Sequence, residues 1–290
     1  MRPPTLTALA ALSVFAISAR GQSPYQSSTD FAKYAMKLRE SALLKIEPQV
    51  YIPTLSRSAV SGKYSWHQNI VTTIFWIGER PTQNNPVPNN ISSWDPDWQR
   101  NYGGFDNPDP GARRNFIPAA FVPQQNPFYC ALPYNDVSRG ETKPEASQVI
   151  PWFRDEFERP GKSVCRDRWL AIRKGNRIVY AQWSDCGPFR TDHWQYVFGN
   201  DKPRPNLNQG AGLDVSPAVR DYLGMSSAGG HDITDWKFVD FRDVPPGPWS
   251  RYGENNNFVI NARRNSDRVA TRTSAPAPAS SSTGPTVITR

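Results

Sequence analysis

The sequence predicts a mainly β fold with long loops. The 290-residue chain contains 28 Pro and 19 Gly, which favour turns over long helices. β-branched and aromatic residues gather in short runs, of which Ile70–Ile77 is the clearest. Two further runs flank Gly175-Asn176, a pair that is typical of a tight hairpin turn. A helical bundle is therefore not expected.

The first 21 residues are expected to be a secretory signal peptide. Arg2 supplies a positive start, and the apolar run Leu6–Ile17 is too short to span a membrane. Ala19-Arg20-Gly21 offers small residues for cleavage near Gly21. An N-terminal membrane anchor is the alternative. The mature protein is then expected to be secreted or periplasmic, monomeric, and without a transmembrane segment.

The net charge of +8 lies mostly at the two ends of the chain. Residues 263–290 hold five Arg and one Asp, and the signal segment holds Arg2 and Arg20, which leaves +2 on residues 21–262. The central part is close to neutral, so we expect no nucleic-acid partner. The basic tail could touch an anionic wall or membrane surface, or could simply be solvated.

The composition divides the chain into four parts, of which the expected signal peptide, residues 1–21, is the first. Residues 22–65 are expected to form a helical extension, with Ser28-Thr29-Asp30 capping a helix at Phe31–Lys45. Residues 66–250 are expected to form the β domain. Residues 251–290 are basic and rich in Ser, Thr and Pro, and beyond about Ala262 they lack any apolar pattern, which indicates a disordered tail.

The β domain contains five predicted strands and one long irregular segment, Thr82–Pro127. The strands are expected at Ile70–Ile77, Phe128–Leu132, Trp169–Ile172, Arg177–Trp183 and Asp235–Phe241. A segment as long as Thr82–Pro127 inside a domain is usually functional or disordered. It carries Trp94 and Trp98, whose rings could stack on sugars or could pack locally.

Two aspartates stand where regular structure ends or restarts. Asp185 ends the Arg177–Trp183 strand, and Gly187-Pro188 breaks that strand just after it. Asp214 precedes a helix start, with Ser216 as N-cap and Pro217 at the first helical position. We expect both carboxylates on one rim of the sheet. Structural roles are the alternative, because Asp often caps turns and favours helix N-termini.

The hairpin register suggests a disulfide. Continued outward from Gly175-Asn176, it pairs Cys165 with Cys186 at a non-hydrogen-bonded position, where side chains lie closest. Pairings of either residue with Cys130 remain open. The spacing of the three His and three Cys matches no zinc site, and no nucleotide-binding motif is present, so no metal and no cofactor are expected.

Several motifs together resemble the rare lipoprotein A-like double-psi β-barrels, which share their barrel with expansins and barwin-like proteins. D-C-G-P-F at Asp185–Phe189 and L-D-V-S at Leu213–Ser216 are similar to the family's D-R-G-P-F and I-D-L-S. Weaker matches are Thr72–Phe75, A-L-P-Y at Ala131–Tyr134, and Trp236–Val239. The resemblance covers roughly Ile70–Val244. It implies a six-stranded double-psi β-barrel with a polysaccharide groove.

The resemblance also implies an exported protein that acts on cell-wall glycans. Bacterial members include lytic transglycosylases, which cleave peptidoglycan strands with one carboxylic acid as general acid and then base. The match assigns that role to Asp185, although in expansin-like relatives the position of Asp214 is the key acid. The expected substrate contacts are His193, Trp194, Trp94, Trp98, Tyr134 and Glu79.

The chain departs from the family's pattern upstream of these motifs. The family's enzymes carry a Glu and a His there, whereas here no His lies between His67 and His193. The alternative function is therefore a non-catalytic, expansin-like protein that binds polysaccharide or loosens the wall.

Overall fold

The computed structural model describes residues 64–82, 85, 87–226 and 230–274. The expected signal peptide and the expected helix at Phe31–Lys45 lie outside the described residues, so neither is tested.

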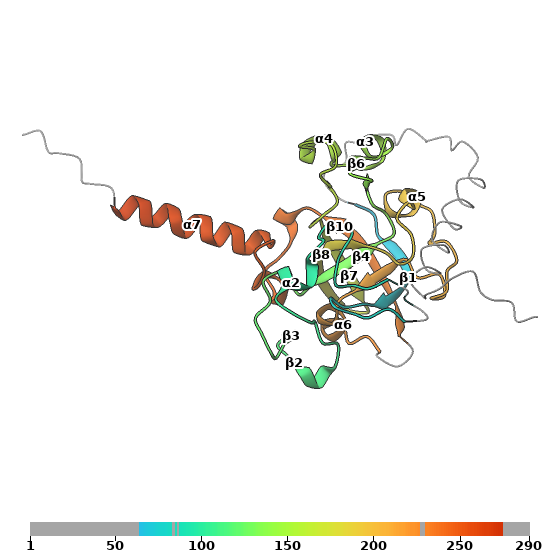
Figure 1. Cartoon of the computed structure of the whole chain (residues 1–290), viewed down its shortest axis with the longest axis horizontal. Helices are drawn as coiled ribbons and strands as arrows, with labels where there is room; N and C mark the ends of the chain where they lie inside the picture. Colours follow the sequence, from blue (N-terminus) through green and yellow to red (C-terminus); the bar gives the residue numbers. More distant parts are fainter. Residues whose placement is uncertain (1–63, 83–84, 86, 227–229, 275–290) are drawn as a thin grey trace, which may run out of the picture. The chain divides into compact units, whose positions relative to one another are not determined.

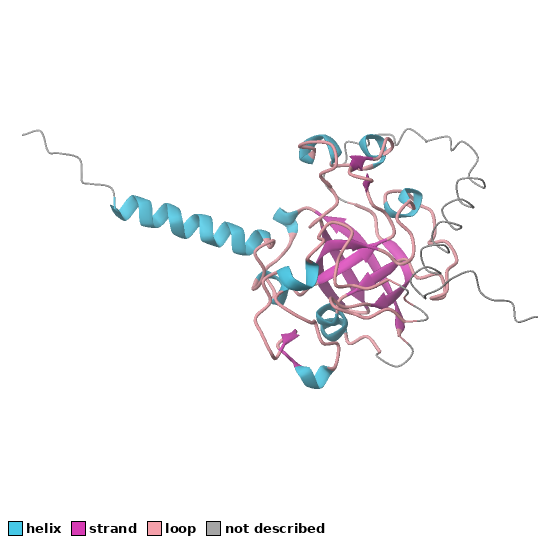
Figure 2. Ribbon diagram, viewed as in Figure 1, coloured by secondary structure: helices cyan, strands magenta, loops and turns pink. Residues whose placement is uncertain are grey.

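Six strands form a closed mixed barrel, which confirms the mainly β prediction (Figures 1 and 2). They are β1 (His67–Ile74), β4 (Tyr129–Leu132), β7 (Trp169–Lys174), β8 (Arg177–Cys186), β9 (Leu213–Val215) and β10 (His231–Val239). Their order around the barrel is β1-β10-β7-β8-β4-β9. β9 closes the barrel against β1 in parallel, and β4 runs parallel to β8 but antiparallel to β9. β9, which strand propensity did not indicate, closes the barrel because it pairs with β1 on one side and with β4 on the other.

Short elements fill the connections between the barrel strands. They are α2 (Trp98–Tyr102), η1 (Pro110–Ala112), β2 (Arg113–Arg114), β3 (Ile117–Pro118), β5 (Val137–Ser138), β6 (Glu141–Thr142), α3 (Ala146–Val149), α4 (Phe153–Glu156), α5 (Trp194–Val197), α6 (Pro217–Leu223), η2 (Phe241–Asp243) and η3 (Pro248–Ser250). α6 begins as predicted, because Ser216 Oγ accepts a hydrogen bond from Val219 N (3.3 Å) and Pro217 occupies the first turn.

The predicted hairpin register is correct, but the predicted disulfide is wrong. β7 and β8 pair from Lys174↔Arg177 to Trp169↔Gln182. β7 starts at Trp169, and Cys165 lies before it in a turn where its carbonyl accepts from Arg168 N (3.2 Å). The bonds on this edge of β8 end at Trp183, whose N donates to Arg168 O (2.8 Å), because the chain before Arg168 is a turn. On its other edge β8 pairs with β4, where Cys186 pairs with Leu132. Cys130, Cys165 and Cys186 are consequently free thiols.

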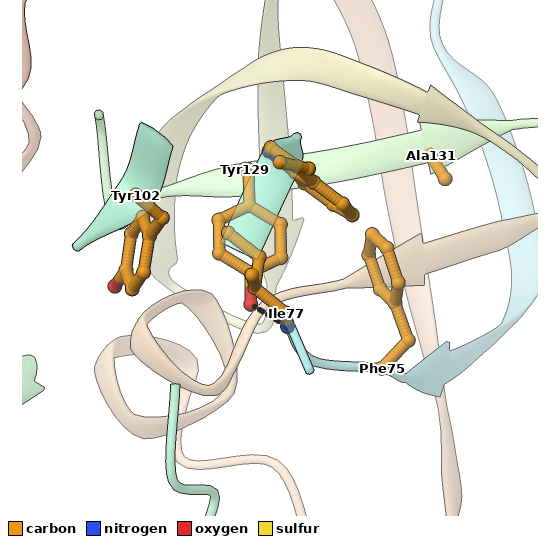
Figure 3. Close-up of a cluster of buried hydrophobic side chains, with 6 residues drawn as sticks. Phe75, Ile77, Tyr102, Tyr129 and Ala131 are labelled. Carbon is orange, nitrogen blue, oxygen red and sulfur yellow. Dashed lines mark hydrogen bonds between the residues drawn. The ribbon is translucent and has the colours of Figure 1, made fainter. Parts of the chain in front are cut away.

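The long segment after β1 packs on the barrel through aromatic side chains rather than forming a free loop. Figure 3 shows this cluster, in which α2 lies against β4 and the end of β1. Its members are Phe75, Ile77, Trp98, Tyr102, Tyr129 and Ala131, with Phe121 packed against them. The ring centroids of Trp98 and Tyr129 are 5.3 Å apart in a T-shaped arrangement. Burial of these rings holds the segment in place.

A buried ion pair holds the same segment from a second side. The guanidinium of Arg113 contacts the Asp106 carboxylate, and both side chains are almost fully buried. Tyr129 OH donates to Asp106 Oδ2 (2.8 Å) and accepts from Ile77 N (3.0 Å). Arg113 Nε also lies 3.3 Å from Asp221 Oδ2 on α6. One arginine thus links the irregular segment to the helix that follows Asp214.

Within the tail that the sequence predicts to be disordered, residues 257–274 form the helix α7 (Asn257–Ser274), and the disorder of the tail stays a prediction. Its first turn docks on the barrel. Asn257 Oδ1 accepts from Trp169 Nε1 (2.8 Å), and the Phe258 ring lies 4.9 Å from that of Phe241. Residues 275–290 lie outside the described part. Among the helices that the structure describes, none is both long and apolar enough to cross a membrane.

Arg113→Ala is expected to lower the free energy of unfolding by about 3–5 kcal/mol, because it leaves the Asp106 carboxylate buried without its counter-ion. The matched control is Arg114→Ala, which removes the exposed neighbouring arginine and should change stability by less than about 0.5 kcal/mol. Urea unfolding at pH 7 measures both. Equal losses in the two variants would show that the buried pair does not hold the segment.

Candidate functional site

Asp185 and Asp214 lie in one register row that crosses four strands. Thr73 of β1 pairs with Asp214, Asp214 pairs with Ala131 of β4, and Ala131 pairs with Asp185 of β8. Residues in register on adjacent strands point to the same face of a sheet. The two aspartates therefore share a face with one strand between them, which places their Cα atoms about 10 Å apart.

A β-bulge in β8 gives Asp185 this position. Cys130 pairs with Trp183 and Ala131 with Asp185, so Ser184 is left without a partner on β4. Side chains alternate between faces along a strand, so a ladder without the bulge would set Ser184 opposite Ala131 and turn Asp185 to the other face. The inserted residue is what brings the carboxylate into the row.

The turn after β8 lies directly against Asp214. A Cβ placed on Gly187 would be 3.3 Å from Asp214 Oδ2 and 4.0 Å from Ala131 Cβ. Gly187 N donates to Leu132 O (3.0 Å), which fixes the turn on β4. The glycine of D-C-G-P therefore allows the backbone to approach the carboxylate of L-D-V-S, and the two motifs form one site.

The carboxyl group of Asp214 is held in an environment that favours its neutral form. Burial raises its pKa to about 7, against a hydrogen bond from Thr73 Oγ1, and the negative charges of Glu79 and Asp185 raise the pKa further. The residue keeps some exposed surface. Asp214 can therefore carry a proton at neutral pH and still exchange it with a ligand.

Asp185 is more strongly hydrogen-bonded than Asp214. Burial raises the pKa of Asp185 to about 6, and hydrogen bonds from Ser93 and the Cys186 backbone oppose that rise. Ser93 N donates to Asp185 Oδ1 at 2.7 Å. Hydrogen bonds to a carboxylate stabilise its ionised form, so Asp185 ionises at a lower pH than Asp214.

Glu79, expected only as a substrate contact, is the third acid of the group. Burial raises its pKa to about 6 despite hydrogen bonds from Asn85, the Trp76 backbone and Asn89. The amides of Asn85 and Asn89 donate to Glu79 Oε2 at 3.1 and 2.9 Å. Three neighbouring carboxyl groups with pKa values of about 6 to 7 titrate as a coupled set near neutral pH.

Three expected substrate contacts are buried and offer a ligand no surface. Trp98, Tyr134 and His193 are 2%, 0% and 1% exposed. Trp98 belongs to the aromatic cluster, and the Tyr134 ring packs 5.2 Å from that of Phe198. Burial, together with the charges of Arg204 and Arg190, lowers the pKa of His193 to about 4. His193 is therefore neutral at pH 7.

Trp94 and Trp194 are only partly buried. Trp94 follows Ser93, which binds Asp185, and its Nε1 donates to Asn135 Oδ1 (2.9 Å). Among the expected aromatic contacts, Trp94 is thus the one tied directly to the carboxylate row. Trp194 begins α5 on a separate connection.

The groups that support the three acids are not among the site residues expected from the sequence. Thr73, Ser93, Asn85 and Asn89 each donate a hydrogen bond to one of these carboxyl groups. A weak signal existed, because the Asn residues follow Glu79 closely and Ser93 precedes the noted Trp94. Within the described residues, no group of His, Cys, Asp and Glu side chains is arranged to hold a metal ion.

A cavity of about 220 Å³ lies elsewhere on the barrel, lined by Ser65–Gln68, Ile70 and Gly199–Lys202. Its lining on β1 ends at Ile70, whereas Thr73 and the carboxylate row are three residues further on, about 10 Å along an extended strand. The cavity is therefore separate from the acidic site.

No protein-family model matches the chain, and a search of curated proteins found no match. A closed six-stranded barrel alone does not identify a family.

Asp214→Asn is expected to stabilise the protein increasingly as the pH rises from about 4 to 7. In the wild type the folded state keeps the Asp214 proton over this range while the unfolded chain, with an ordinary pKa of about 3.9, releases it. Wild-type stability should fall by at most about 1.4 kcal/mol per pH unit from this group, and the amide removes that loss. Urea unfolding across pH 4–8 measures the difference.

Asp232→Asn is the control with the opposite sign. Although burial acts to raise it, the pKa of Asp232 is lowered by the hydrogen bonds from Lys174, Ile233 and Ser226. Its carboxylate therefore stabilises the fold above about pH 4, and this contribution fades as the pH falls. A difference between Asp214→Asn and wild type that stays constant from pH 4 to 7 would contradict a raised pKa for Asp214.

Proposed function

We propose that the protein is exported and cleaves glycan strands of the cell wall, in the manner of a lytic transglycosylase acting on peptidoglycan. One observation carries the proposal: the partly exposed Asp214 shares a register row with Asp185, and the turn at Gly187 lies against its carboxylate. Burial and the negative charges of Glu79 and Asp185 raise the pKa of this carboxyl group to about 7. Acid–base cleavage of a glycosidic bond needs such a proton donor beside an ionised carboxylate.

The resemblance to double-psi β-barrels supports the proposal and extends it to the fold. The closed six-stranded mixed barrel is compatible with that architecture. The two motifs that carry the resemblance meet at one site, because Gly187 lies against Asp214 Oδ2. Secretion or a periplasmic location, with cleavage near Gly21, is part of the same proposal.

We assign the proton donor to Asp214 and the ionised partner to Asp185. The sequence match favoured Asp185 as the general acid. The contacts favour the exchange of roles, because Ser93 N stabilises the Asp185 carboxylate at 2.7 Å, whereas two neighbouring negative charges favour the protonated form of Asp214. The acid with the higher pKa is the better donor near pH 7.

In this mechanism Asp214 gives its proton to the glycosidic oxygen as the bond to the anomeric carbon breaks. Asp185 stabilises the positive charge that develops on that carbon. The Asp214 carboxylate then takes the proton of the sugar's own hydroxyl group, whose oxygen bonds to the anomeric carbon and closes an anhydro ring. No water is consumed, and Asp214 ends protonated as it began.

The alternative is an expansin-like protein that binds polysaccharide without cleaving it. The upstream His of the family's enzymes has no counterpart here, and His193 is 1% exposed, so it does not replace that group. A barrel that keeps the acidic motifs but lacks this residue could bind glycans only.

Asp214→Asn is expected to reduce glycan cleavage by roughly 10²–10⁴-fold, because the amide has no proton to transfer at neutral pH. The wild-type rate should follow a bell-shaped pH profile, falling below about pH 6 as Asp185 gains a proton and above about pH 7 as Asp214 loses one. Mass spectrometry of peptidoglycan strands incubated with residues 22–290 reads the products. Asp232→Asn is the control and should cleave normally.

Anhydro-ended fragments would support the proposal, whereas hydrolysed ends would indicate water as the nucleophile. Saturable binding of glycan with no new chain ends would replace it with the expansin-like alternative. Full cleavage by Asp214→Asn together with none by Asp185→Asn would return the general acid to Asp185.

A further inference from the structure

Helix α7 contains a stretch whose side chains are all exposed. Residues 261–268 are exposed without exception, although the helix continues to Ser274. In water, a helix gains most of its stability by packing an apolar face against the rest of the protein. Residues 261–268 have no such buried face, so we look for their role in the side chains that they expose to solvent.

The base of α7 is fixed on the barrel by specific contacts. Asn256 is fully buried, and its Oδ1 accepts from Phe258 N (3.1 Å) while its amide donates to Trp249 O (2.8 Å). Trp169 Nε1 donates to Asn257 Oδ1, and the Phe258 and Trp169 ring centroids lie 5.9 Å apart. These contacts fix the first turn of the helix to the strand β7, so the exposed stretch begins from a structured base.

The exposed stretch presents a row of arginines. Arg264 and Arg268 are one helical turn apart and both exposed, and Arg272 follows four residues later in the sequence of the same helix. α7 as a whole carries four Arg and one Asp. One of them, Arg263, contacts Glu254 at 3.3 Å. Like charges four residues apart destabilise a helix, so an anionic partner along this face would remove that repulsion.

The composition of the stretch indicates which kind of anionic partner fits. A helix that lies on a lipid surface needs bulky apolar residues opposite its basic face. Residues 261–274 contain Ala262, Val269 and Ala270 as their only apolar side chains. A helix–helix interface would likewise need a regular apolar row. A solvated polyanion requires neither, because it binds through charge and counter-ion release.

We propose that the exposed face of α7 that carries Arg264 and Arg268 binds an acidic polysaccharide through its carboxylate groups, with Arg272 as a further positive charge of the same helix. The choice of a polysaccharide over other polyanions rests on the proposed function, since a wall glycan-cleaving protein would work among such polymers. Binding on α7 leaves the carboxylate row free, because the helix is anchored by contacts with Trp169 of β7 and Phe241 of η2. Asp185 and Asp214 instead pair with Ala131 of β4.

The test measures binding of residues 22–290 to fluorescently labelled polygalacturonate, with dextran as the neutral polymer. Wild type should bind polygalacturonate and not dextran, and the logarithm of the affinity should fall with the logarithm of the salt concentration with a slope on the order of −2 to −3 for three contacts. The triple variant R264Q/R268Q/R272Q should bind roughly tenfold more weakly or worse, with a flatter salt dependence.

The matched control is R139Q/R154Q/R159Q, which removes the same charge from other exposed positions and should bind as wild type does. Equal weakening in both triple variants would show a general charge effect and overturn the proposal. Binding to phosphatidylglycerol vesicles or duplex DNA that exceeds binding to polygalacturonate would overturn it too. Asp214→Asn should bind polygalacturonate normally, so loss of cleavage and loss of polyanion binding are read separately.

Discussion

The short strand β4 pairs on both sides, and the rest of the structure depends on this pairing. Its four residues, Tyr129–Leu132, run parallel to β8 and antiparallel to β9. Each of the four is almost fully buried, so the strand cannot shift by one residue without turning its side chains to the wrong face. Through Ala131 the same pairing joins Asp185 and Asp214, so barrel closure and the acidic row have one origin.

Burying the carboxyl groups of Asp185, Asp214 and Glu79 opposes folding, since burial raises the pKa of each. The irregular segment after β1 offsets part of this cost. It supplies Ser93 to Asp185 and Asn89 to Glu79. The aromatic cluster and the Arg113–Asp106 pair keep the segment in place. The long segment after β1 therefore has two effects on these carboxyl groups. It buries them, which raises their pKa values, and it donates hydrogen bonds to them.

The distribution of positive charge fits the same requirement. An arginine beside Asp214 would lower its pKa and remove the protonated form at neutral pH. A basic face on α7 could attract an anionic polymer without this effect, because solvent-exposed charges more than about 8 Å apart are largely screened at physiological salt. The near-neutral composition of residues 21–262 and the basic composition of the chain after them are consistent with such a separation.

The features that depend on neighbouring residues could be predicted from the sequence. The Gly175-Asn176 turn, the pairing of β7 with β8, and the Ser216 cap with Pro217 all follow from local backbone preferences. The two aspartate motifs were also visible, because turn and cap residues flank them. Local preference cannot say which strand comes next to which, since that depends on burial over the whole chain.

The remaining features depend on tertiary contacts between distant parts of the chain. Tertiary structure formed a turn at Cys165–Arg168, which separated Cys165 from the ladder that Cys186 forms with β4. It paired the three residues of β9, too few to show a periodic pattern, with β1 and β4. It also brought the charge of Glu79, five residues after the end of β1, close enough to raise the pKa of Asp214. Aromatic side chains such as Trp98 suit a ligand surface and a core equally well, and only the packing of α2 on β4 placed that ring in the core.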